Sequence, residues 1–295
     1  MGEEKLVNSQ IAVLPDGRQL GYITLGSGKP LLYFHGTASS RLEVLLLEEL
    51  AKNGLRLIGV DRPGYGISTF KERSLTSFNL DINSLMDYLG IKKFGILGWS
   101  GGSIFALAYL AFFPDRITRT VVAASPSLPF DASKAHNMPL ARYIMQLPMV
   151  GEIALNRMRS QVLKANGNIA AFLNSRQGKQ MLNGCSSSDL KFFSDPPWVS
   201  LLYRSMAEAF RQGTFGVKAV LGEHKLFLKP WTFHFSVPND KLRIWHGSED
   251  KTCPVSNAYA LSRSVGSGQL EIFEGYGHCV MFDNLPKLAE LFNLA

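Results

Sequence analysis

Short apolar runs alternate with amphipathic stretches along much of the chain, and this alternation predicts its secondary structure. Six runs are brief and mostly apolar, which is typical of buried strands: 31–34, 55–60, 94–97, 120–124, 242–245 and 270–273. The run 31–34 is continuously apolar, as in a strand buried on both faces. Between the six runs, apolar positions recur at helical spacing, as at Phe78, Ile82 and Leu85. Strands that alternate with helices predict a parallel sheet.

Turn and capping residues set the limits of these elements. Two β-rich segments, 10–13 and 20–24, flank Pro15-Asp16-Gly17 and therefore predict an N-terminal hairpin. Helices are predicted at 43–53, from 77 to a cap at Gly90, at 103–113, at 257–264 and from 286 onward.

The alternation stops in the middle of the chain. Residues 131–235 are helical in pattern, rich in methionine and interrupted by Gly, Pro and Ser, and the sheet pattern resumes at 242. We therefore predict an α/β core formed by 1–130 and 236–295, with 131–235 inserted between two strands as a mainly helical lid.

The positive charge of the chain is confined to this predicted lid. The lid has 13 Lys or Arg and six Asp or Glu, whereas the rest has 18 of each, so the lid carries the whole net charge of +7. The excess predicts either attraction of an anionic substrate, partner or membrane surface, or a solvated helical surface, which is the simpler interpretation. No nucleic-acid binding is expected, because no recognised binding motif accompanies the basic composition.

Composition predicts a cytoplasmic protein. The 295 residues are 46% apolar, enough for one large domain or a core with an insertion. Three cysteines are too few for a disulfide framework and are expected to be free thiols, and the acidic start of the chain does not resemble an export signal. Residues 94–113 lack charge and match a membrane span in length, but the Gly-rich turn in their middle would break that helix. No stable membrane insertion is therefore expected.

Residues 98–102, Gly-Trp-Ser-Gly-Gly, fit G-x-S-x-G, a turn that lifts a serine above a sheet. A predicted strand precedes the turn and a predicted helix follows it, which is the context that it requires. Side chains at the flanking positions would collide with the crossing backbone, so glycines are needed there. Ser100 is therefore the candidate nucleophile.

A serine nucleophile needs a base and an orienting acid, which follow it in the chain order Ser, Asp or Glu, His in this type of fold. His278 lies in a Gly-rich loop after the last predicted strand and is the best placed of the six histidines. Asp250 follows the strand at 242–245, at the sheet edge where the sites of parallel sheets form. Glu249 is its nearest competitor. Since 124–127, after the preceding strand, lacks an acid, Asp250 is preferred.

Acyl transfer passes through an oxyanion that two backbone N–H groups must face. Gly101, directly after the candidate nucleophile, is expected to supply one donor. Thr37, in the loop after the strand at 31–34, is expected to supply the other. We expect His35, in the same loop, to hold it by hydrogen bonds.

Together these motifs resemble the α/β-hydrolase fold superfamily, in its capped Ser-His-Asp form. The matching segments are His35-Gly36, 61–68, 98–102, 247–254 and Gly277-His278, which in this order span nearly all of the chain outside the predicted lid. The resemblance implies a mostly parallel central sheet flanked by helices, with a structural role for 61–68. It does not cover the lid, where the substrate is selected.

These residues predict a carboxylesterase-like serine hydrolase in which Ser100 attacks an ester carbonyl, His278 transfers the proton and Asp250 orients His278. The expected partner is a small molecule with an acyl group; no cofactor or metal motif is present, so none is expected. Several lid side chains predict an apolar, adaptable pocket, although helix packing explains them equally well: Met138, Met145, Met149, Met158, Met181, Met206, Trp198, Phe210 and Trp231.

Alternatives remain open. A proline-iminopeptidase-like aminopeptidase would need lid acids to hold a substrate ammonium, which a basic lid disfavours. A C–C bond hydrolase acting on a carboxylated diketone suits a basic lid, with Arg142, Arg157 or Arg204 as the carboxylate clamp. Epoxide hydrolases and haloalkane dehalogenases carry Asp at the nucleophile position, where this chain has Ser100. A non-catalytic binding protein with this fold would have a degraded triad, whereas all three positions are filled.

Overall fold

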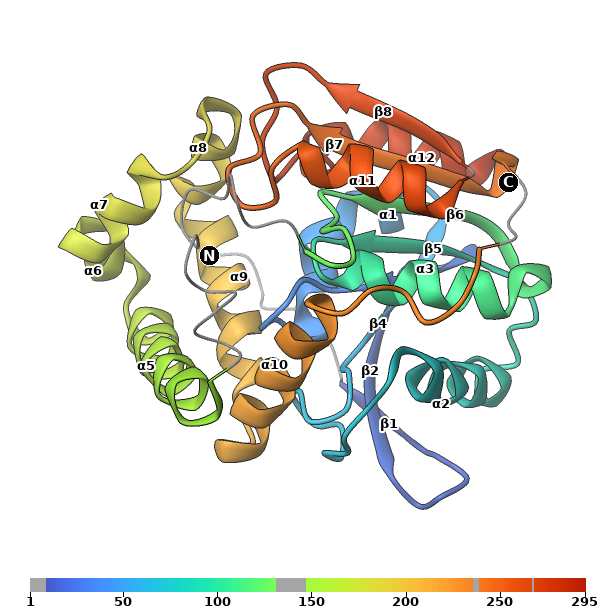
Figure 1. The fold of residues 1–295 in the computed structure, drawn as a ribbon, viewed down its shortest axis with the longest axis horizontal. Coiled ribbons are helices and arrows are strands. Elements are labelled where there is room, and N and C mark those ends of the chain that lie inside the picture. Colours follow the sequence, from blue (N-terminus) through green and yellow to red (C-terminus); the bar gives the residue numbers. More distant parts are fainter. Residues whose placement is uncertain (1–8, 131–146, 236–238, 267) are drawn as a thin grey trace.

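The computed structural model describes residues 9–130, 147–235, 239–266 and 268–295. Within them the strands form one eight-stranded sheet in the order β1-β2-β4-β3-β5-β6-β7-β8 (Figure 1). The pairs β1–β2 and β2–β4 are antiparallel and the other neighbours are parallel, so the predicted hairpin and the mostly parallel sheet are confirmed. The strands are β1 Gln10–Val13, β2 Gln19–Leu25, β3 Lys29–Phe34, β4 Leu55–Val60, β5 Phe94–Trp99, β6 Ile117–Ala123, β7 Leu242–Gly247 and β8 Gln269–Phe273.

Both faces of the sheet are buried, because successive residues of the central strands point to opposite sides and most are apolar. In β3, Leu32 and Phe34 join the apolar cluster that includes α2 and α3, whereas Leu31 and Tyr33 join the cluster that includes α1 and α12. Helices therefore cover both sides, as the continuous apolar run at 31–34 predicts.

The core helices follow the predicted pattern with two differences. They are α1 Glu48–Lys52, α2 Leu75–Tyr88, α3 Gly102–Phe112, α11 Ser256–Val265 and α12 Leu285–Asn293. The predicted helix at 43–53 starts earlier, as the 3-10 helix η1 Arg41–Leu47, and becomes α1 only at Glu48. α2 begins before 77, because Ser74 and Ser77 form a reciprocal capping box.

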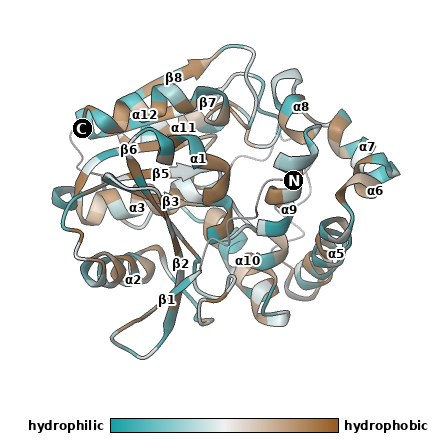
Figure 2. Ribbon diagram, turned by 180° about the vertical axis from the view of Figure 1, so that it is seen from behind, coloured by the Kyte–Doolittle hydropathy of each residue, from teal (hydrophilic) through white to brown (hydrophobic). Residues whose placement is uncertain are grey.

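Hydropathy varies along the helices, and Figure 2 shows polar and apolar residues on the same ribbons. The uncharged stretch 94–113 is divided into β5, a turn and α3, as predicted. Of the helices that the described residues form, none has the length and apolar character needed to cross a membrane.

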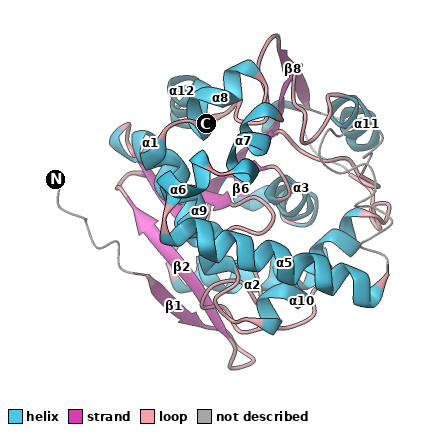
Figure 3. Ribbon diagram, turned by 90° about the vertical axis from the view of Figure 1, so that its left-hand side faces the viewer, coloured by secondary structure: helices cyan, strands magenta, loops and turns pink. Residues whose placement is uncertain are grey.

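Only helices lie between β6 and β7 in the described residues, and we call them the cap: α5 Pro148–Gly167, α6 Ile169–Asn174, α7 Arg176–Asn183, α8 Ser187–Phe193, α9 Pro196–Ala209 and α10 Thr214–Phe227. Figures 1 and 3 show the cap helices gathered on one side of the core. The helical insertion is thereby confirmed. Its predicted limits, 131 and 235, stay predictions, since 131–146 and 236–238 lie outside the described residues.

Helix α9 joins the cap to η1 of the core through buried polar contacts. The hydroxyl of Ser205 accepts a hydrogen bond from the backbone N–H of Ser40 at 3.1 Å and lies 2.9 Å from the hydroxyl of Ser39. Glu208 accepts from Arg41 at 2.9 Å. The 3-10 segment thus presents its buried polar side chains to the cap as well as to the core.

The close packing of α3 on β3 can be tested at Gly102. A Cβ at this position would overlap the carbonyl oxygens of Phe34 and His35, whereas a Cβ at Gly222 of α10 would meet open space. We expect Gly102→Ala to lower the free energy of unfolding in urea by about 1–3 kcal/mol. Gly222→Ala, the matched control, should raise it by up to about 1 kcal/mol, because alanine favours a helix. Similar unfolding of both variants would contradict the described packing.

Candidate active site

Ser100 occupies a strained turn between a strand and a helix. β5 ends at Trp99 and α3 begins at Gly102, and the φ angle of Ser100 is +53°. A left-handed conformation at a residue with a side chain costs about 1–3 kcal/mol and is found mainly where function requires it. The N–H of Ser100 donates to the carbonyl of Ala123 at 2.9 Å, which fixes the turn against β6.

The structure brings Asp250 and His278 together from the ends of β7 and β8. Oδ2 of Asp250 lies 2.8 Å from Nδ1 of His278. Oδ1 accepts the backbone N–H groups of Thr252 and Cys253, each at 2.8 Å, so the turn itself orients the carboxylate. Asp250 is buried, whereas its predicted competitor Glu249 is exposed.

Two further side chains support this pair, and the sequence did not single them out for this role. Nε2 of His246 lies 3.4 Å from Oδ2 of Asp250 and 2.7 Å from the carbonyl oxygen of Cys253. The indole N–H of Trp99 donates to the carbonyl of His278 at 2.9 Å. His246 lies near the end of β7, and Trp99 is the variable position of G-x-S-x-G. Nothing in the neighbouring sequence therefore indicates which residue either side chain contacts.

Charge distribution favours a proton on His278 over His246. Burial disfavours the imidazolium of His278, but the charge and hydrogen bond of Asp250 outweigh it, aided by Asp189, and the pKa of His278 is raised above 6.5. Burial lowers the pKa of His246 despite the same carboxylate. The two histidines that contact Asp250 therefore differ in basicity.

The loop 35–37 after β3 lies against the turn of Ser100. A Cβ on Gly101 would overlap the hydroxyl oxygen of Thr37. The backbone N–H groups of Gly101 and Thr37 donate no hydrogen bond to another described residue, and both residues line the same cavity as Ser100. His35 is buried, with Nδ1 2.8 Å from the carbonyl oxygen of Gly36, in agreement with its predicted structural role.

Arg62 holds this loop from behind. Its guanidinium donates to the carbonyl oxygens of His35 at 2.6 Å and Gly36 at 3.0 Å. The same guanidinium makes two hydrogen bonds of 2.8 Å to Glu223, which belongs to α10 of the cap. The resemblance implied a structural role for 61–68. Within this segment, Arg62 performs such a role by positioning the loop that contains Thr37.

Glu223 is the centre of a buried cluster that joins cap and core. Besides Arg62, its carboxylate accepts from Arg73 at 2.7 Å, from the Tyr65 hydroxyl at 3.0 Å and from the Thr37 hydroxyl at 2.8 Å. Burial opposes ionisation of Glu223, but Arg62 and Arg73 hold its pKa below its usual value. Glu223 is therefore a charged anchor under the loop 35–37.

A second cap acid, Asp189 of α8, holds the loop that carries His278. Its two oxygens accept the backbone N–H groups of His278 at 2.9 Å and Cys279 at 2.8 Å, and the hydroxyl of Ser188 accepts that of Gly277 at 2.8 Å. A Cβ at Gly277 would overlap the Asp189 carboxylate, which explains the glycine. The sequence pattern does not distinguish this acid from others in the predicted lid.

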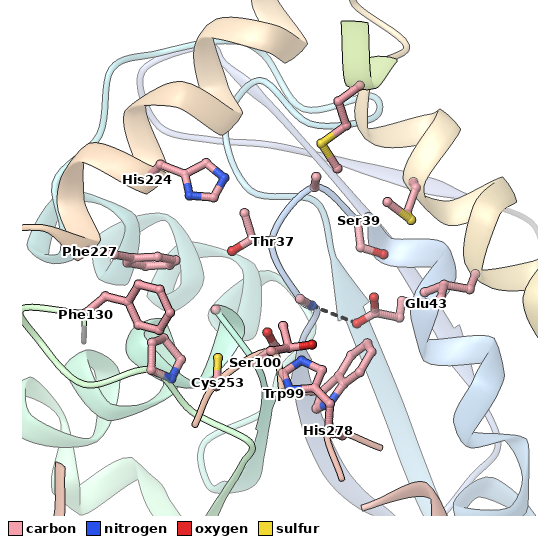
Figure 4. A pocket seen from close by; sticks show the side chains of 18 of the residues that line it. Thr37, Ser39, Glu43, Trp99, Ser100, Phe130, His224, Phe227, Cys253 and His278 are labelled. Carbon is pink, nitrogen blue, oxygen red and sulfur yellow. Dashed lines mark hydrogen bonds between the residues drawn. The ribbon is translucent and has the colours of Figure 1, made fainter. Parts of the chain in front are cut away.

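A cavity of about 320 Å³ lies between the cap and these loops. Ser100, Gly101, Thr37 and His278 line it, so the structure brings four of the five predicted site residues to one cavity, while Asp250 lies behind His278. Figure 4 shows an aromatic side, with Phe130, Phe227 and His224, and a polar side, with Ser39 and Glu43. Cap residues complete the lining: Leu155, Met158, Leu202, Met206 and His224.

Some side chains predicted for the pocket lie elsewhere. Of the predicted set, Met158 and Met206 line the cavity, Met149 is exposed, and Met138 and Met145 lie outside the described residues. The others pack in apolar clusters: Met181, Trp198, Phe210 and Trp231. The Arg157 and Arg204 side chains are exposed and do not line the cavity, and Arg142 lies outside the described residues.

The cysteines at 185, 253 and 279 are free, as predicted. Within the described part of the chain, no group of three or more His, Cys, Asp or Glu side chains is arranged to hold a metal ion.

The sheet order, the helical insertion and the turn of Ser100 define an α/β-hydrolase architecture. A model of the alpha/beta hydrolase fold family matches residues 29–285, and the chain therefore belongs to this family.

The proteins to which this chain is similar are named for different hydrolytic activities. The chain is 26% identical to a proline iminopeptidase of Xylella fastidiosa, over 91% of this chain and 90% of that one. An esterase from Exiguobacterium antarcticum is similar in structure, with a TM-score of 0.66 and 20% identity, over 96% of this chain and 97% of that one. The epoxide hydrolase CorEH superposes with a TM-score of 0.67 and 18% identity, over 96% of each chain. These structural similarities concern the fold alone.

The role of Asp189 can be tested without an activity assay. Asp189→Ala removes the acceptor of two backbone N–H groups, so the loop 277–279 should open more often and expose Cys279, which is fully buried. We expect alkylation of Cys279, followed by mass spectrometry, to accelerate about fivefold or more. Asp195→Ala, at an exposed acid of the same cap, is the control and should react like the wild type. Equal rates for all three proteins would contradict this role of Asp189.

Proposed function

We propose that the protein is a serine hydrolase that cleaves carboxylic esters through an acyl-enzyme. The observation that carries the proposal is the 2.8 Å contact between Asp250 and His278, with His278 and Ser100 lining one cavity. A serine in a strained turn, an imidazole and a buried carboxylate are the groups that this chemistry requires.

In the proposed reaction, Oγ of Ser100 attacks the ester carbonyl carbon while Nε2 of His278 takes the hydroxyl proton. Asp250 keeps the proton on Nδ1 and stabilises the imidazolium that forms. When the tetrahedral intermediate collapses, His278 gives its proton to the departing alkoxide, and the alcohol leaves. Water then repeats the sequence at the acyl-enzyme, with His278 as its base, and releases the carboxylic acid and free Ser100.

The oxyanion of the tetrahedral intermediate would be held by the backbone N–H groups of Gly101 and Thr37. Their unused N–H groups beside Ser100 support this role, because oxyanion donors must be available before the charge develops. The anchoring of the loop by Arg62 and Glu223 would keep the Thr37 donor in place during the reaction.

An aminopeptidase is the second candidate, and one observation bears on it. Three of the acids available in the cap are engaged with the core: Asp189, Glu208 and Glu223. Among the described residues that line the cavity, the carboxylate that remains is Glu43 of the core. A substrate amine would therefore have to be recognised by Glu43.

Replacing the nucleophile gives the most direct test. We expect Ser100→Ala to reduce kcat/KM for short p-nitrophenyl esters at least about 10³-fold, with little change in folding. The wild type should also be labelled on Ser100 by a fluorophosphonate probe, which mass spectrometry would detect. Ser160→Ala, at an exposed cap serine, is the matched control. If Ser100→Ala hydrolyses the esters as fast as the wild type, the proposed function is wrong; an unlabelled Ser100 would instead favour a non-catalytic binding protein.

The pH dependence follows from the raised pKa of His278. His278 acts as a base only when it is neutral, so kcat/KM should rise with pH and reach half its plateau above pH 6.5. Asp189→Asn removes a negative charge that raises this pKa, so the midpoint should move to lower pH. Rate profiles of both proteins between pH 5 and 9 measure the shift. An upward shift in Asp189→Asn would contradict the electrostatic assignment.

A further inference from the structure

The polar side of the cavity contains a carboxyl group that the proposed chemistry does not use. Glu43, from η1, is fully buried and lines the cavity beside Trp99 and His278. Its Oε1 accepts two hydrogen bonds, from the Tyr33 hydroxyl at 2.7 Å and from the N–H of Gly36 at 2.8 Å. Its Oε2 has no hydrogen-bond partner within the described residues.

The surroundings leave this oxygen unsatisfied. No ion pair joins Glu43 to a cation in the described part of the chain, in contrast to the buried Asp61 and Glu223. Ser39 lies beside the carboxyl group (Figure 4), but its hydroxyl is 2.9 Å from that of Ser205 and makes no hydrogen bond to Oε2. A buried polar atom without a partner is costly, and proteins keep few of them.

Holding the loop 35–37 does not by itself require a carboxyl group here. A glutamine at position 43 could accept the same two hydrogen bonds through its amide oxygen, without a buried acid. Burial raises the pKa of Glu43, although the nearby Ser39 hydroxyl and the hydrogen bonds from Gly36 and Tyr33 oppose it, so ionising this group in the folded protein is unfavourable. The second oxygen is therefore not needed for the structural role, and it belongs to a residue that lines the cavity containing Ser100.

We propose that Oε2 of Glu43, with the neighbouring Ser39, forms a subsite for a hydrogen-bond-donating group of the substrate, a hydroxyl or an amino group near the scissile carbonyl. This inference rests on the proposed ester hydrolysis and adds a substrate class to it. A hydroxyl satisfies Oε2 in either protonation state because it both donates and accepts, whereas an ammonium satisfies the carboxylate. At about 320 Å³ the cavity is small, which keeps the donor within a few bonds of the ester.

Two matched pairs of esters separate the donor's chemistry and position. Glyceryl monobutyrate and propyl butyrate share an acyl chain and differ by hydroxyl groups on the alcohol. Alanine methyl ester and methyl propionate share an alcohol and differ by an amino group on the acyl chain. The measured quantity is the ratio of kcat/KM within each pair, which is insensitive to the fraction of active protein.

We expect the wild type to favour the donor-bearing ester of at least one pair about fivefold or more, since leaving a buried acceptor unpaired costs a factor of about 5 to 150. The ratio should fall toward one for both pairs in Glu43→Leu, which has no polar atom at this position. In Glu43→Gln it should fall for the amino ester, because an amide N–H cannot accept from an ammonium, whereas a hydroxyl can still accept from that N–H. Glu49→Gln, at an exposed acid of α1, is the control and should keep the wild-type ratio. Glu43→Gln should unfold at a temperature equal to or above that of the wild type, because its structural bonds remain.

The outcomes distinguish this inference from the proposed function. A wild type that hydrolyses the esters with ratios near one in both pairs, or a preference that persists in Glu43→Leu, overturns the subsite and leaves the hydrolase intact. A wild type that is labelled by the fluorophosphonate probe but cleaves none of the four esters also overturns it. A wild type with neither labelling nor hydrolysis refutes the proposed function, and the subsite falls with it. A preference confined to one pair identifies the donor as a hydroxyl or an amine.

Discussion

The buried ion pair between Arg62 and Glu223 joins the two parts of the structure on which the site depends. Arg62 binds the backbone of the loop 35–37 and Glu223 binds the hydroxyl of Thr37, so the pair holds this loop from both the core and the cap. Both side chains are fully buried, and leaving either charge without its partner would cost about 3–5 kcal/mol. Movement of α10 away from the core would therefore disturb the loop as well as open the cavity.

The cap thus contributes to the candidate site in two ways, because its side chains line the cavity and its acids hold the loops of the core. Glu223 secures the loop 35–37 and Asp189 secures the loop of His278, and each does so through buried hydrogen bonds to the core. This arrangement also bears on the charge of the cap. Several of its acids contact the core, whereas bases such as Lys164, Arg176 and Lys218 are exposed. The surface of the cap therefore has more positive than negative side chains.

The site combines features that work against stability with others that restore it. Ser100 is held at a positive φ, and the second oxygen of Glu43 is buried without a partner. Such features persist only where the surrounding structure enforces them. Here the conformation is held by the buried central strands and by the ion cluster of Glu223, Arg62 and Arg73. The strained Ser100 and the unsatisfied Glu43 thus line the same cavity.

Local patterns in the sequence determined most of the core. Short, mostly apolar runs predicted six parallel strands, because a strand covered on both faces needs apolar residues at most positions. Gly-containing turns at the strand ends marked Ser100, Asp250 and His278 as candidates. Parallel strands end at one edge of the sheet, so the meeting of Asp250 with His278 followed from the order of the elements.

Only the tertiary structure decided which residues surround that site. Asp189, Glu223 and Glu43 carry no local signal, since a charged residue in a helix is exposed in most proteins and becomes buried only when a distant segment supplies its partners. The partners of Glu223 lie about 150 positions earlier in the chain, at Arg62 and Arg73. Contacts over such distances depend on how the cap is placed on the core, and this placement is set by packing rather than by any short sequence pattern.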